Sequence, residues 1–237
     1  MRITIGAALH RAARNAGTAA GQYRARADRI GGMLPYASCT QGARNLAALR
    51  AADWRILCSP SQPKPPPGFG YALDNGAWSL YTSGGRWNKE HESGWATLVD
   101  RIGTGADWVV LPDIVCGGSE SLSLSLSWLP RLHGLTTLLI PVQDGMEDRD
   151  VAGVLSPGVG LFIGGSTEWK LATVGRWIRL AQRAGAWCHV GRVNSGKRIR
   201  LIRGATSFDG TSATRFSCTV APLDSARNGV RKQQVLF

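Results

Sequence analysis

Acidic or amide side chains follow four short apolar runs in this sequence, and their types suit proton transfer and nucleophilic attack. Asp74 follows YAL, Asp113 follows VVLP, Gln143 and Asp144 follow IPV, and Asp209 follows TSF. An Asp at such a position is often only a turn residue, because its carboxylate bonds nearby backbone N–H groups. Several such groups at one rim could instead supply a nucleophile and an acid/base at the anomeric carbon of a sugar.

Aromatic and small residues accompany these polar groups. Trp78 comes shortly after Asp74 and could either stack on a flat ring or pack in the core. The pair Gly164 and Gly165 follows GLFI and would let the backbone approach a ligand closely. There is no GxGxxG or GxxxxGK[ST] pattern, so a dinucleotide or P-loop site is not indicated. His189, inside an apolar run, is typical of a buried histidine with satisfied hydrogen bonds.

Short apolar runs alternate with helix-like segments, and this alternation predicts the elements that position the polar groups. Continuous apolar runs such as WVVLP and TLLIPV fit strands that are buried on both faces of a parallel sheet. The expected strands are Met33–Ala37, Arg55–Cys58, Gly70–Leu73, Trp108–Leu111, Thr137–Val142, Gly160–Ile163, Ala186–Val190 and Thr206–Phe208. The expected helices are Gln41–Ala52, Lys89–Gly103, Ser119–Leu132, Met146–Leu155, Thr167–Ala184 and Ser195–Arg203.

Eight strands with helices in most gaps predict a single α/β domain over residues 1–237, a compact (β/α)8 TIM-type barrel. An open doubly wound sheet is the alternative. In a barrel of this type, functional groups lie at the C-terminal ends of the strands and in the loops that follow. Asp74, Asp113, Gln143 and Asp209 would therefore share one rim.

The net charge of +12 is concentrated at the two ends of the chain. Residues 1–55 carry nine arginines against two acidic residues, and residues 192–237 carry nine basic against two acidic residues. Basic flanks favour a polyanion such as nucleic acid, although arginine-rich codon usage alone would also produce them. Closure of a barrel puts strand 8 beside strand 1 and would join the flanks into one basic surface. The residues expected to contact nucleic acid are Arg192, Lys197, Arg198 and Arg215.

The five cysteines are scattered, and no CxxC pattern occurs, so neither a structural zinc site nor a disulfide framework is indicated. No apolar run approaches the ~20 residues of a membrane span, and the N-terminus lacks the charge order of a signal peptide. We therefore expect reduced thiols in a cytoplasm, no membrane partner, no metal and no cofactor.

Short motifs between about residue 70 and residue 216 resemble, in the same order, those of the tRNA-guanine transglycosylase superfamily. The segment DNGAW from Asp74 is similar to the family's Asp-Ser-Gly-Gly-aromatic motif, with two substitutions. Asp113 matches the Asp that recognises the base. Gln143 matches the Gln of Val-Gln-Gly, with Asp144 in place of the Gly.

Two further segments extend the resemblance. GLFIG from Gly160 is similar to the family's Gly-Leu-Ala-Val-Gly. FDGTSATR from Phe208 keeps the spacing from the family's nucleophilic Asp to its Thr-Arg pair, and this is the most specific single match. The match implies a (β/α)8 barrel on which guanine is exchanged for a 7-deazaguanine base.

The resemblance also implies roles for the rim residues. Asp209 would attack C1′ and form a covalent sugar–enzyme intermediate, and Asp74 would be the general acid/base. The purine would be bound by Asp113, Gln143, Gly164 and Gly165, with Trp78 stacking on it.

The family's tRNA enzymes follow the nucleophile with a zinc site of three Cys and one His, whereas this chain has only Cys218 there. The resemblance therefore favours the shorter relatives, from phages and bacterial modification clusters, that insert bases such as preQ0 into DNA. The expected partners are DNA, rather than RNA, and a free 7-deazaguanine, in the cytoplasm (of the host, for a phage protein). A base exchanger on RNA, a carboxylate-dependent N-glycoside hydrolase and a non-catalytic nucleic-acid-binding protein are the alternatives.

Overall fold

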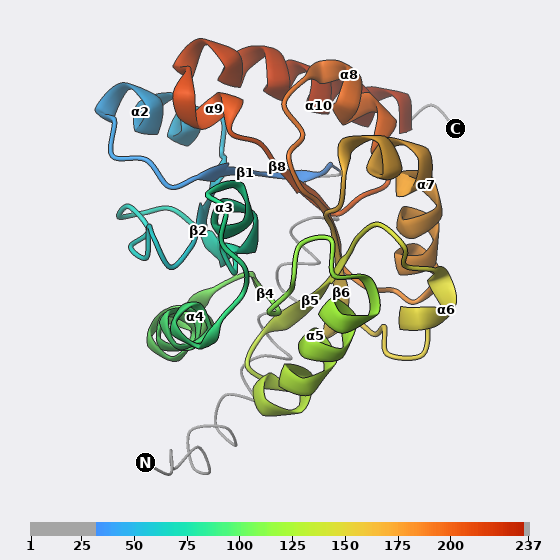
Figure 1. Ribbon diagram of the computed structural model, residues 1–237. Helices are drawn as coiled ribbons and strands as arrows, with labels where there is room; N and C mark the ends of the chain where they lie inside the picture. The colour runs from blue at the N-terminus through green and yellow to red at the C-terminus, as the bar shows by residue number, and fades with distance from the viewer. Residues whose placement is uncertain (1–31, 235–237) are drawn as a thin grey trace.

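Eight parallel strands close into a barrel whose strand order is the chain order, as a computed structural model covering residues 32–234 shows (Figure 1). Strand β8 pairs with β1, with Tyr36 opposite Asp209, and this pairing closes the barrel. The predicted (β/α)8 barrel is therefore confirmed. The strands are β1 (Leu34–Ser38), β2 (Arg55–Cys58), β3 (Tyr71–Leu73), β4 (Trp108–Val110), β5 (Thr137–Val142), β6 (Val159–Ile163), β7 (Cys188–Val190) and β8 (Ser207–Asp209).

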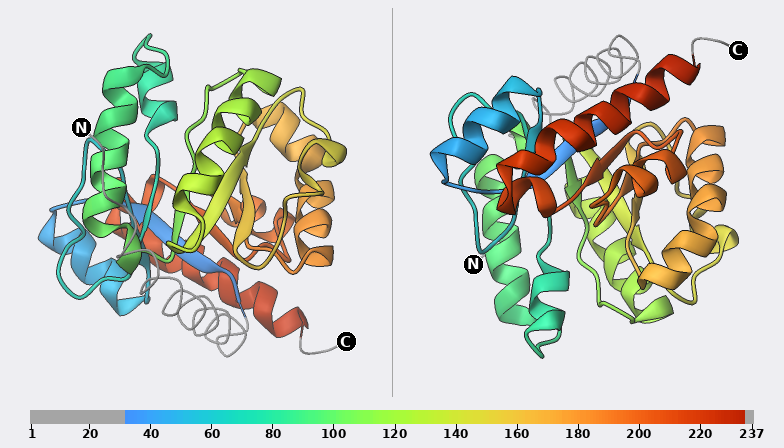
Figure 2. Two further views of the ribbon diagram at one scale, coloured as in Figure 1. Left: turned by 90° about the horizontal axis from the view of Figure 1, so that it is seen from below. Right: turned by 90° about the horizontal axis from the view of Figure 1, so that it is seen from above.

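Helices surround the strands on the outside of the barrel (Figures 1 and 2). Helix α7, the longest of the described helices, begins where the sequence predicts, and Ser166 caps it by accepting a hydrogen bond from the backbone N–H of Trp169. None of the described helices is long and apolar enough to cross a membrane. The helices are α2 (Ala43–Ala51), α3 (Ala77–Thr82), α4 (Lys89–Ile102), α5 (Gly118–Leu132), α6 (Asp148–Val151), α7 (Thr167–Arg183), α8 (Gly196–Leu201), α9 (Ser212–Arg215) and α10 (Val220–Gln234), with 3-10 turns η1 (Gly103–Gly105) and η2 (Ser217–Thr219).

All eight predicted strands are present within about two residues of their expected bounds, and all six predicted helices exist. The expected helix Met146–Leu155 is only a single turn, α6, because Gly153, a poor helix former, follows the C-cap Ala152 directly. Three helices, α3, α9 and α10, were not expected. Helix α10 contains Pro222, which is tolerated there because the first-turn N–H groups of a helix have no partner inside it.

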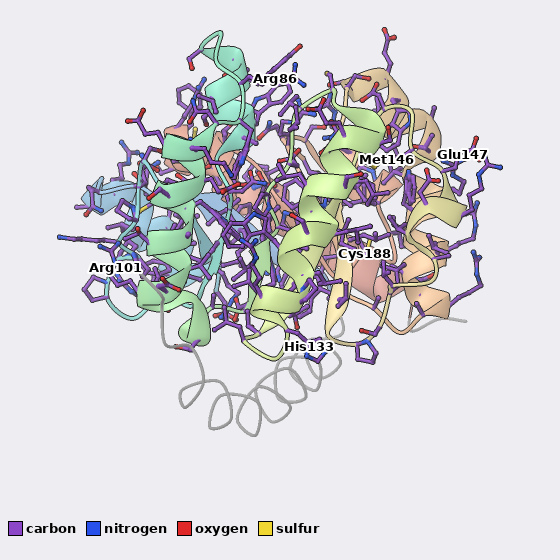
Figure 3. All side chains as sticks on the ribbon, turned by 60° about the horizontal axis from the view of Figure 1, so that its bottom comes forward. Arg86, Arg101, His133, Met146, Glu147 and Cys188 are labelled. Carbon is purple, nitrogen blue, oxygen red and sulfur yellow. The ribbon has the colours of Figure 1, made fainter. Side chains whose placement is uncertain are left out.

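The core has two layers. Inside the barrel, large side chains including Tyr36, Trp108 and Trp187 pack together, and the second layer lies between the strands and the helices. Side chains occupy the space between the ribbons throughout the described part of the molecule (Figure 3). Because the interior is filled, a ligand can enter only at an end of the barrel.

A buried charged pair lies near the N-terminal ends of the strands. Arg55 bonds both carboxylate oxygens of Asp107, and the hydroxyl of Tyr36 donates to the same carboxylate at 2.7 Å. The side chain of Asp107 is fully buried and that of Arg55 is 9% exposed. A bidentate guanidinium–carboxylate pair with a third donor compensates the loss of hydration of both ions.

We expect Arg55→Met to lower the free energy of unfolding by about 3–5 kcal/mol, because the carboxylate of Asp107 stays buried without its cation. Urea unfolding followed by circular dichroism measures the change. The control is Arg86→Met, which breaks the exposed Arg86–Glu120 pair and should cost less than about 1 kcal/mol. Equal effects of the two variants would contradict this account.

Candidate active site

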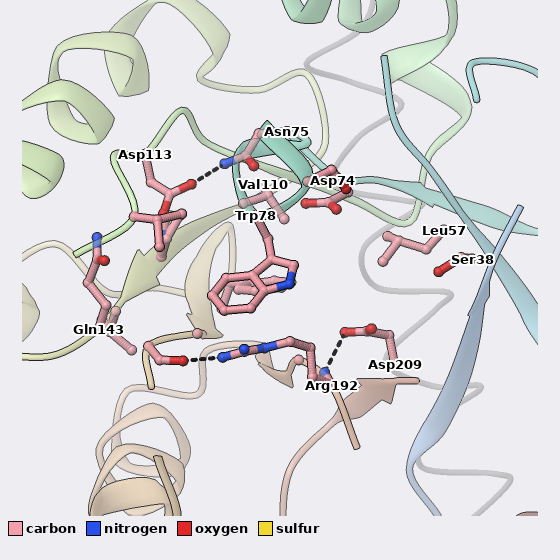
Figure 4. A pocket seen from close by; sticks show the side chains of 18 of the residues that line it. Ser38, Leu57, Asp74, Asn75, Trp78, Val110, Asp113, Gln143, Arg192 and Asp209 are labelled. Atoms are coloured by element: carbon pink, nitrogen blue, oxygen red, sulfur yellow. Dashed lines mark hydrogen bonds between the residues drawn. The ribbon is translucent and has the colours of Figure 1, made fainter. Parts of the chain in front are cut away.

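Four of the five polar groups that the sequence places at strand ends, Asp74, Asp113, Gln143 and Asp209, meet in one pocket at the C-terminal end of the barrel (Figure 4). Each comes from a different strand or the loop after it, so the barrel alone brings them together. All the residues predicted to be catalytic or to bind the purine lie in the wall of this pocket: Asp74, Trp78, Asp113, Gln143, Gly164, Gly165 and Asp209.

Asp209 is the last residue of β8, and it is buried. Its Oδ1 accepts a hydrogen bond from the Nε2 of His189 at 3.0 Å and one from the backbone N–H of Arg192 at 3.3 Å. Among the described residues, no group donates to its Oδ2. One oxygen of the carboxylate is thus held by the protein, and the other is left for a ligand.

Asp74 follows β3 and faces the same pocket as Asp209 (Figure 4). Burial, together with the negative charges of Asp209 and Asp113, raises the pKa of Asp74 to about 7. The backbone N–H groups of Gly76 and Asn75 oppose this rise only in part. Asp74 can therefore hold or release a proton near neutral pH.

Helix α4 holds the loop that carries Asp74 in place. The carbonyl of Asn75 lies 2.8 Å from the Nε2 of His91 on α4. Gly76 has a positive φ of 78°, and a Cβ there would come within 3.3 Å of the His91 ring, so a glycine suits this position. Helix α4 therefore positions Asp74 through the backbone.

Asn75 connects the loops after β3 and β4. Its Nδ2 donates to Oδ1 of Asp113 and to the carbonyl of Leu111, both at 2.7 Å, and its Oδ1 accepts from the N–H of Ala77 at 2.9 Å. Burial raises the pKa of Asp113 to about 6, although the hydrogen bond from Asn75 lowers it. Sequence reasoning assigned Asn75 no role, and its only signal was its place in the DNGAW motif.

Gln143 contributes to the pocket wall and also orders the loop after β4. Its Nε2 donates to the carbonyl of Ile114 at 2.9 Å, and its Oε1 accepts from the N–H of Cys116 at 2.6 Å. The amide keeps one N–H and one lone pair beyond these bonds.

Asp144, which stands where the family motif has Gly, connects the loops after β5 and β6. It accepts hydrogen bonds from the N–H and the hydroxyl of Ser166, both at 2.6 Å. Burial alone would raise the pKa of Asp144, but the Ser166 bonds outweigh it and the pKa is lowered. Asp144 therefore fixes the shape of the rim and is not among the residues that form the pocket wall.

Arg192 lies inside the pocket, whereas the sequence led us to expect it on a nucleic-acid-binding surface. Its φ is 61°, a left-handed conformation, and its guanidinium donates to the carbonyl of Gly165. The guanidinium carbon lies over the Trp78 ring, 3.9 Å from its centre, in a cation–π contact (Figure 4). Trp78 is still 41% exposed, so it is a rim residue and not part of the core.

The other residues predicted to contact nucleic acid lie on the loops and short helices after β7 and β8. Lys197 and Arg215 are exposed, and Arg198 is half-buried with its Nη1 3.4 Å from the carbonyl oxygen of Arg192. Most of the basic N-terminal segment, residues 1–31, lies outside the described residues, so the predicted joint basic surface stays a prediction.

The pocket carboxylates are not arranged as a metal site. Within residues 32–234, no three His, Cys, Asp or Glu side chains are grouped closely enough to hold a metal ion. Asp209 and Asp113 each have one oxygen bonded to an N–H donor of the protein. The arrangement instead fits proton transfer and nucleophilic attack.

The raised pKa of Asp74 predicts how stability depends on pH. A carboxyl whose folded-state pKa is raised stabilises the fold below its ordinary pKa, and this contribution is lost as pH rises through the folded value. Asp74→Asn should therefore be more stable than the wild type at about pH 8, by on the order of 2 kcal/mol, with little difference at about pH 4. Urea titrations at both pH values test this, and equal stability at about pH 8 would contradict it.

Comparisons with known proteins bear on the fold. No family model matches the chain, and no curated protein matches it by sequence. Tryptophan synthase from M. tuberculosis, in its aminoacrylate-bound form, is 13% identical with a TM-score of 0.51, and the match covers 88% of this chain and 99% of that one. The YdjI aldolase from Escherichia coli K12 is 10% identical with a TM-score of 0.50, and the match covers 91% of this chain and 95% of that one. At such low identity, these similarities establish the barrel fold alone.

Proposed function

We propose that this protein is a base-exchanging transglycosylase that replaces guanine in DNA with a 7-deazaguanine base through a covalent Asp209–sugar intermediate. The observation that carries the proposal is the pair of carboxylates in one pocket with different environments. Asp209 accepts N–H donors on one oxygen only, whereas the pKa of Asp74 is raised to about 7. A pair of carboxyl groups with such different environments suits a nucleophile and an acid/base.

In the first half-reaction, Oδ2 of Asp209 attacks C1′ of the target deoxyguanosine. The bond from C1′ to N9 breaks, its electron pair stays on the departing guanine, and protonated Asp74 gives that base a proton. Asp209 is then esterified to the sugar, and Asp74 is a carboxylate. The pKa near 7 lets Asp74 hold this proton at physiological pH.

In the second half-reaction, the incoming 7-deazaguanine occupies the site of the departed guanine. Carboxylate Asp74 takes the proton from N9 of the new base as N9 attacks C1′. The ester bond to Asp209 breaks, and its electron pair returns to the carboxylate. Both carboxyl groups end in their starting states, so the exchange needs no cofactor or outside redox reagent.

The pocket wall offers matching contacts for a guanine-like ring. A carboxylate such as Asp113 can accept from the N–H groups on the Watson–Crick edge, and Gln143 keeps one N–H that can donate to the carbonyl of the base. The exposed ring of Trp78 offers a stacking surface. Guanidinium Arg192 now covers one face of that ring and would have to move, or the base would stack on the other face.

DNA as the polymer is supported by the basic flanks and by the family resemblance. A base in a duplex must leave the stack to reach a pocket at the end of a barrel, which costs a few kcal/mol. Exposed cations near the pocket, such as Lys197 and Arg215, can contact phosphates on either side of the extruded nucleotide.

The test incubates the protein with guanine-containing DNA and preQ0, followed by nucleoside analysis by mass spectrometry. Incorporated 7-deazaguanine supports the proposal. Release of free guanine without incorporation would indicate a hydrolase, and DNA binding without either would indicate a non-catalytic protein. An RNA of the same sequence is run in parallel, and exchange in RNA alone would overturn the assignment to DNA.

A further inference from the structure

A chain of hydrogen bonds runs through the barrel interior to the proposed nucleophile. Nε1 of Trp187 lies 2.8 Å from Oγ of Ser207, and that oxygen lies 2.8 Å from Nδ1 of His189. Nε2 of His189 then lies 3.0 Å from Oδ1 of Asp209. These bonds link Trp187, just before β7, and His189 of β7 to residues of β8, because the strand register puts Ser207 opposite His189. All four side chains are buried.

The first group of this chain sets the direction of every bond in it. An indole N–H can only donate, so Oγ of Ser207 accepts from Trp187. The buried hydroxyl of Ser207 can then satisfy its own hydrogen only by donating to Nδ1 of His189. With Nδ1 as an acceptor, the proton of the neutral imidazole is on Nε2, which donates to Asp209. This tautomer alone satisfies the indole N–H of Trp187, the hydroxyl of Ser207 and both ring nitrogens of His189.

Packing holds the imidazole in place and keeps it neutral. The ring is stacked on Phe162 at 5.0 Å between centroids and is 4.5 Å from the centroid of Trp108. Burial lowers the pKa of His189, and the nearby positive charge of Lys170 on α7 acts in the same direction, although Asp209 opposes both. The ring of Tyr36 on β1 completes its surroundings.

We propose that His189 is a positioning residue that selects which oxygen of Asp209 attacks the sugar, an inference that rests on the proposed function. Donation from Nε2 of His189 and from the N–H of Arg192 engages Oδ1 and fixes the plane of the carboxylate. Oδ2 is left as the nucleophile. When Oδ2 forms the ester, Oδ1 becomes the carbonyl oxygen and still accepts from His189, so no proton moves along the chain.

Activity measurements with three variants test this proposal. His189→Leu removes the donor, and His189→Gln retains an N–H at a similar distance. Ser207→Ala removes the hydroxyl that sets the tautomer. We expect His189→Leu to lower the single-turnover rate of adduct formation by about 10- to 100-fold, with KM for DNA within about 3-fold of the wild type. His189→Gln should recover much of the rate, and Ser207→Ala should fall between. The control is His133→Leu at the exposed end of α5, which should match the wild type.

A second measurement does not depend on activity. Nitrogen-15 NMR of the histidine ring at about pH 7 should show the neutral Nε2–H tautomer for His189 in the wild type, and a mixture of tautomers in Ser207→Ala. An imidazolium or Nδ1–H form in the wild type would overturn the proposal, as would wild-type rates for both His189→Leu and Ser207→Ala. If the wild type exchanges no base at all, the proposed function fails. The NMR result still decides whether the hydrogen bonds run from Trp187 through Ser207 and His189 to Asp209.

Discussion

Asp209→Asn should abolish base exchange and the covalent adduct, with a loss of roughly 10³-fold or more in the rate. An amide is a far weaker nucleophile than a carboxylate, although it has nearly the same shape and can still accept from His189 and Arg192 through its oxygen. The fold should therefore persist. The measurement is a denaturing gel of the protein mixed with guanine-containing DNA and preQ0, with circular dichroism to confirm folding.

The matched control is Asp100→Asn, which neutralises an exposed carboxylate on α4 away from the pocket. It should form the adduct at the wild-type rate. A folded Asp209→Asn protein that still forms a denaturation-resistant adduct would show that another residue is the nucleophile. Loss of adduct in both variants would show that the assay responds to net charge and not to the pocket.

Asp74→Asn should lower the rate of adduct formation by about 10²- to 10⁴-fold, because guanine would leave without a proton. The pH profile gives a sharper result. In the wild type the first half-reaction needs protonated Asp74, so its rate should fall as pH rises through about 7. The second half-reaction needs the carboxylate, so its rate should fall as pH drops below about 7. We call these two changes of rate the two limbs of the pH profile, and both should disappear in Asp74→Asn.

Single-turnover experiments separate the two halves, the first without added base and the second from preformed adduct. Asp113→Asn provides a comparison, because Asp113 lies in the same pocket but is assigned to the purine. Asp113→Asn should raise KM for the free base. Because it removes one of the two negative charges that raise the pKa of Asp74, it should also move both limbs to lower pH without removing them. If the Asp74→Asn variant keeps the same two limbs near pH 7 as the wild type, the acid/base role belongs to another group.

Sequence reasoning reached the barrel because strands buried on both faces appear as continuous apolar runs. It reached the pocket because polar residues directly after such runs fall at one rim. The sequence did not predict how side chains from different strands contact each other. The sequence of β7 indicates only that His189 is buried, and its partners on β8 become known only when the strand register is known. Arg192 follows β7 in an exposed-looking loop, and nothing in its neighbours indicates the left-handed backbone that turns it inward.

The helices that the sequence did not predict also depend on tertiary contacts. Helices α3 and α9 are short segments that come directly after site residues, where packing against the barrel decides the conformation and propensity counts for little. Asp144 shows the limit of motif matching. It occupies a family position that carries Gly, and only its bonds to Ser166 show that the replacement shapes the rim.

Closure of the sheet by pairing β8 with β1 has a consequence for how the site forms during folding. Asp209 comes to its position only when the last strand reaches the first across nearly the whole described chain, a contact with a large loop-closure entropy. His189 already meets Asp209 through the pairing of β7 with β8. The proposed nucleophile and the carboxylate that follows β3, in contrast, are brought together only by this contact of high contact order. A partly folded barrel would hold isolated carboxylates and no pocket, so unfinished chains would carry none of the proposed chemistry.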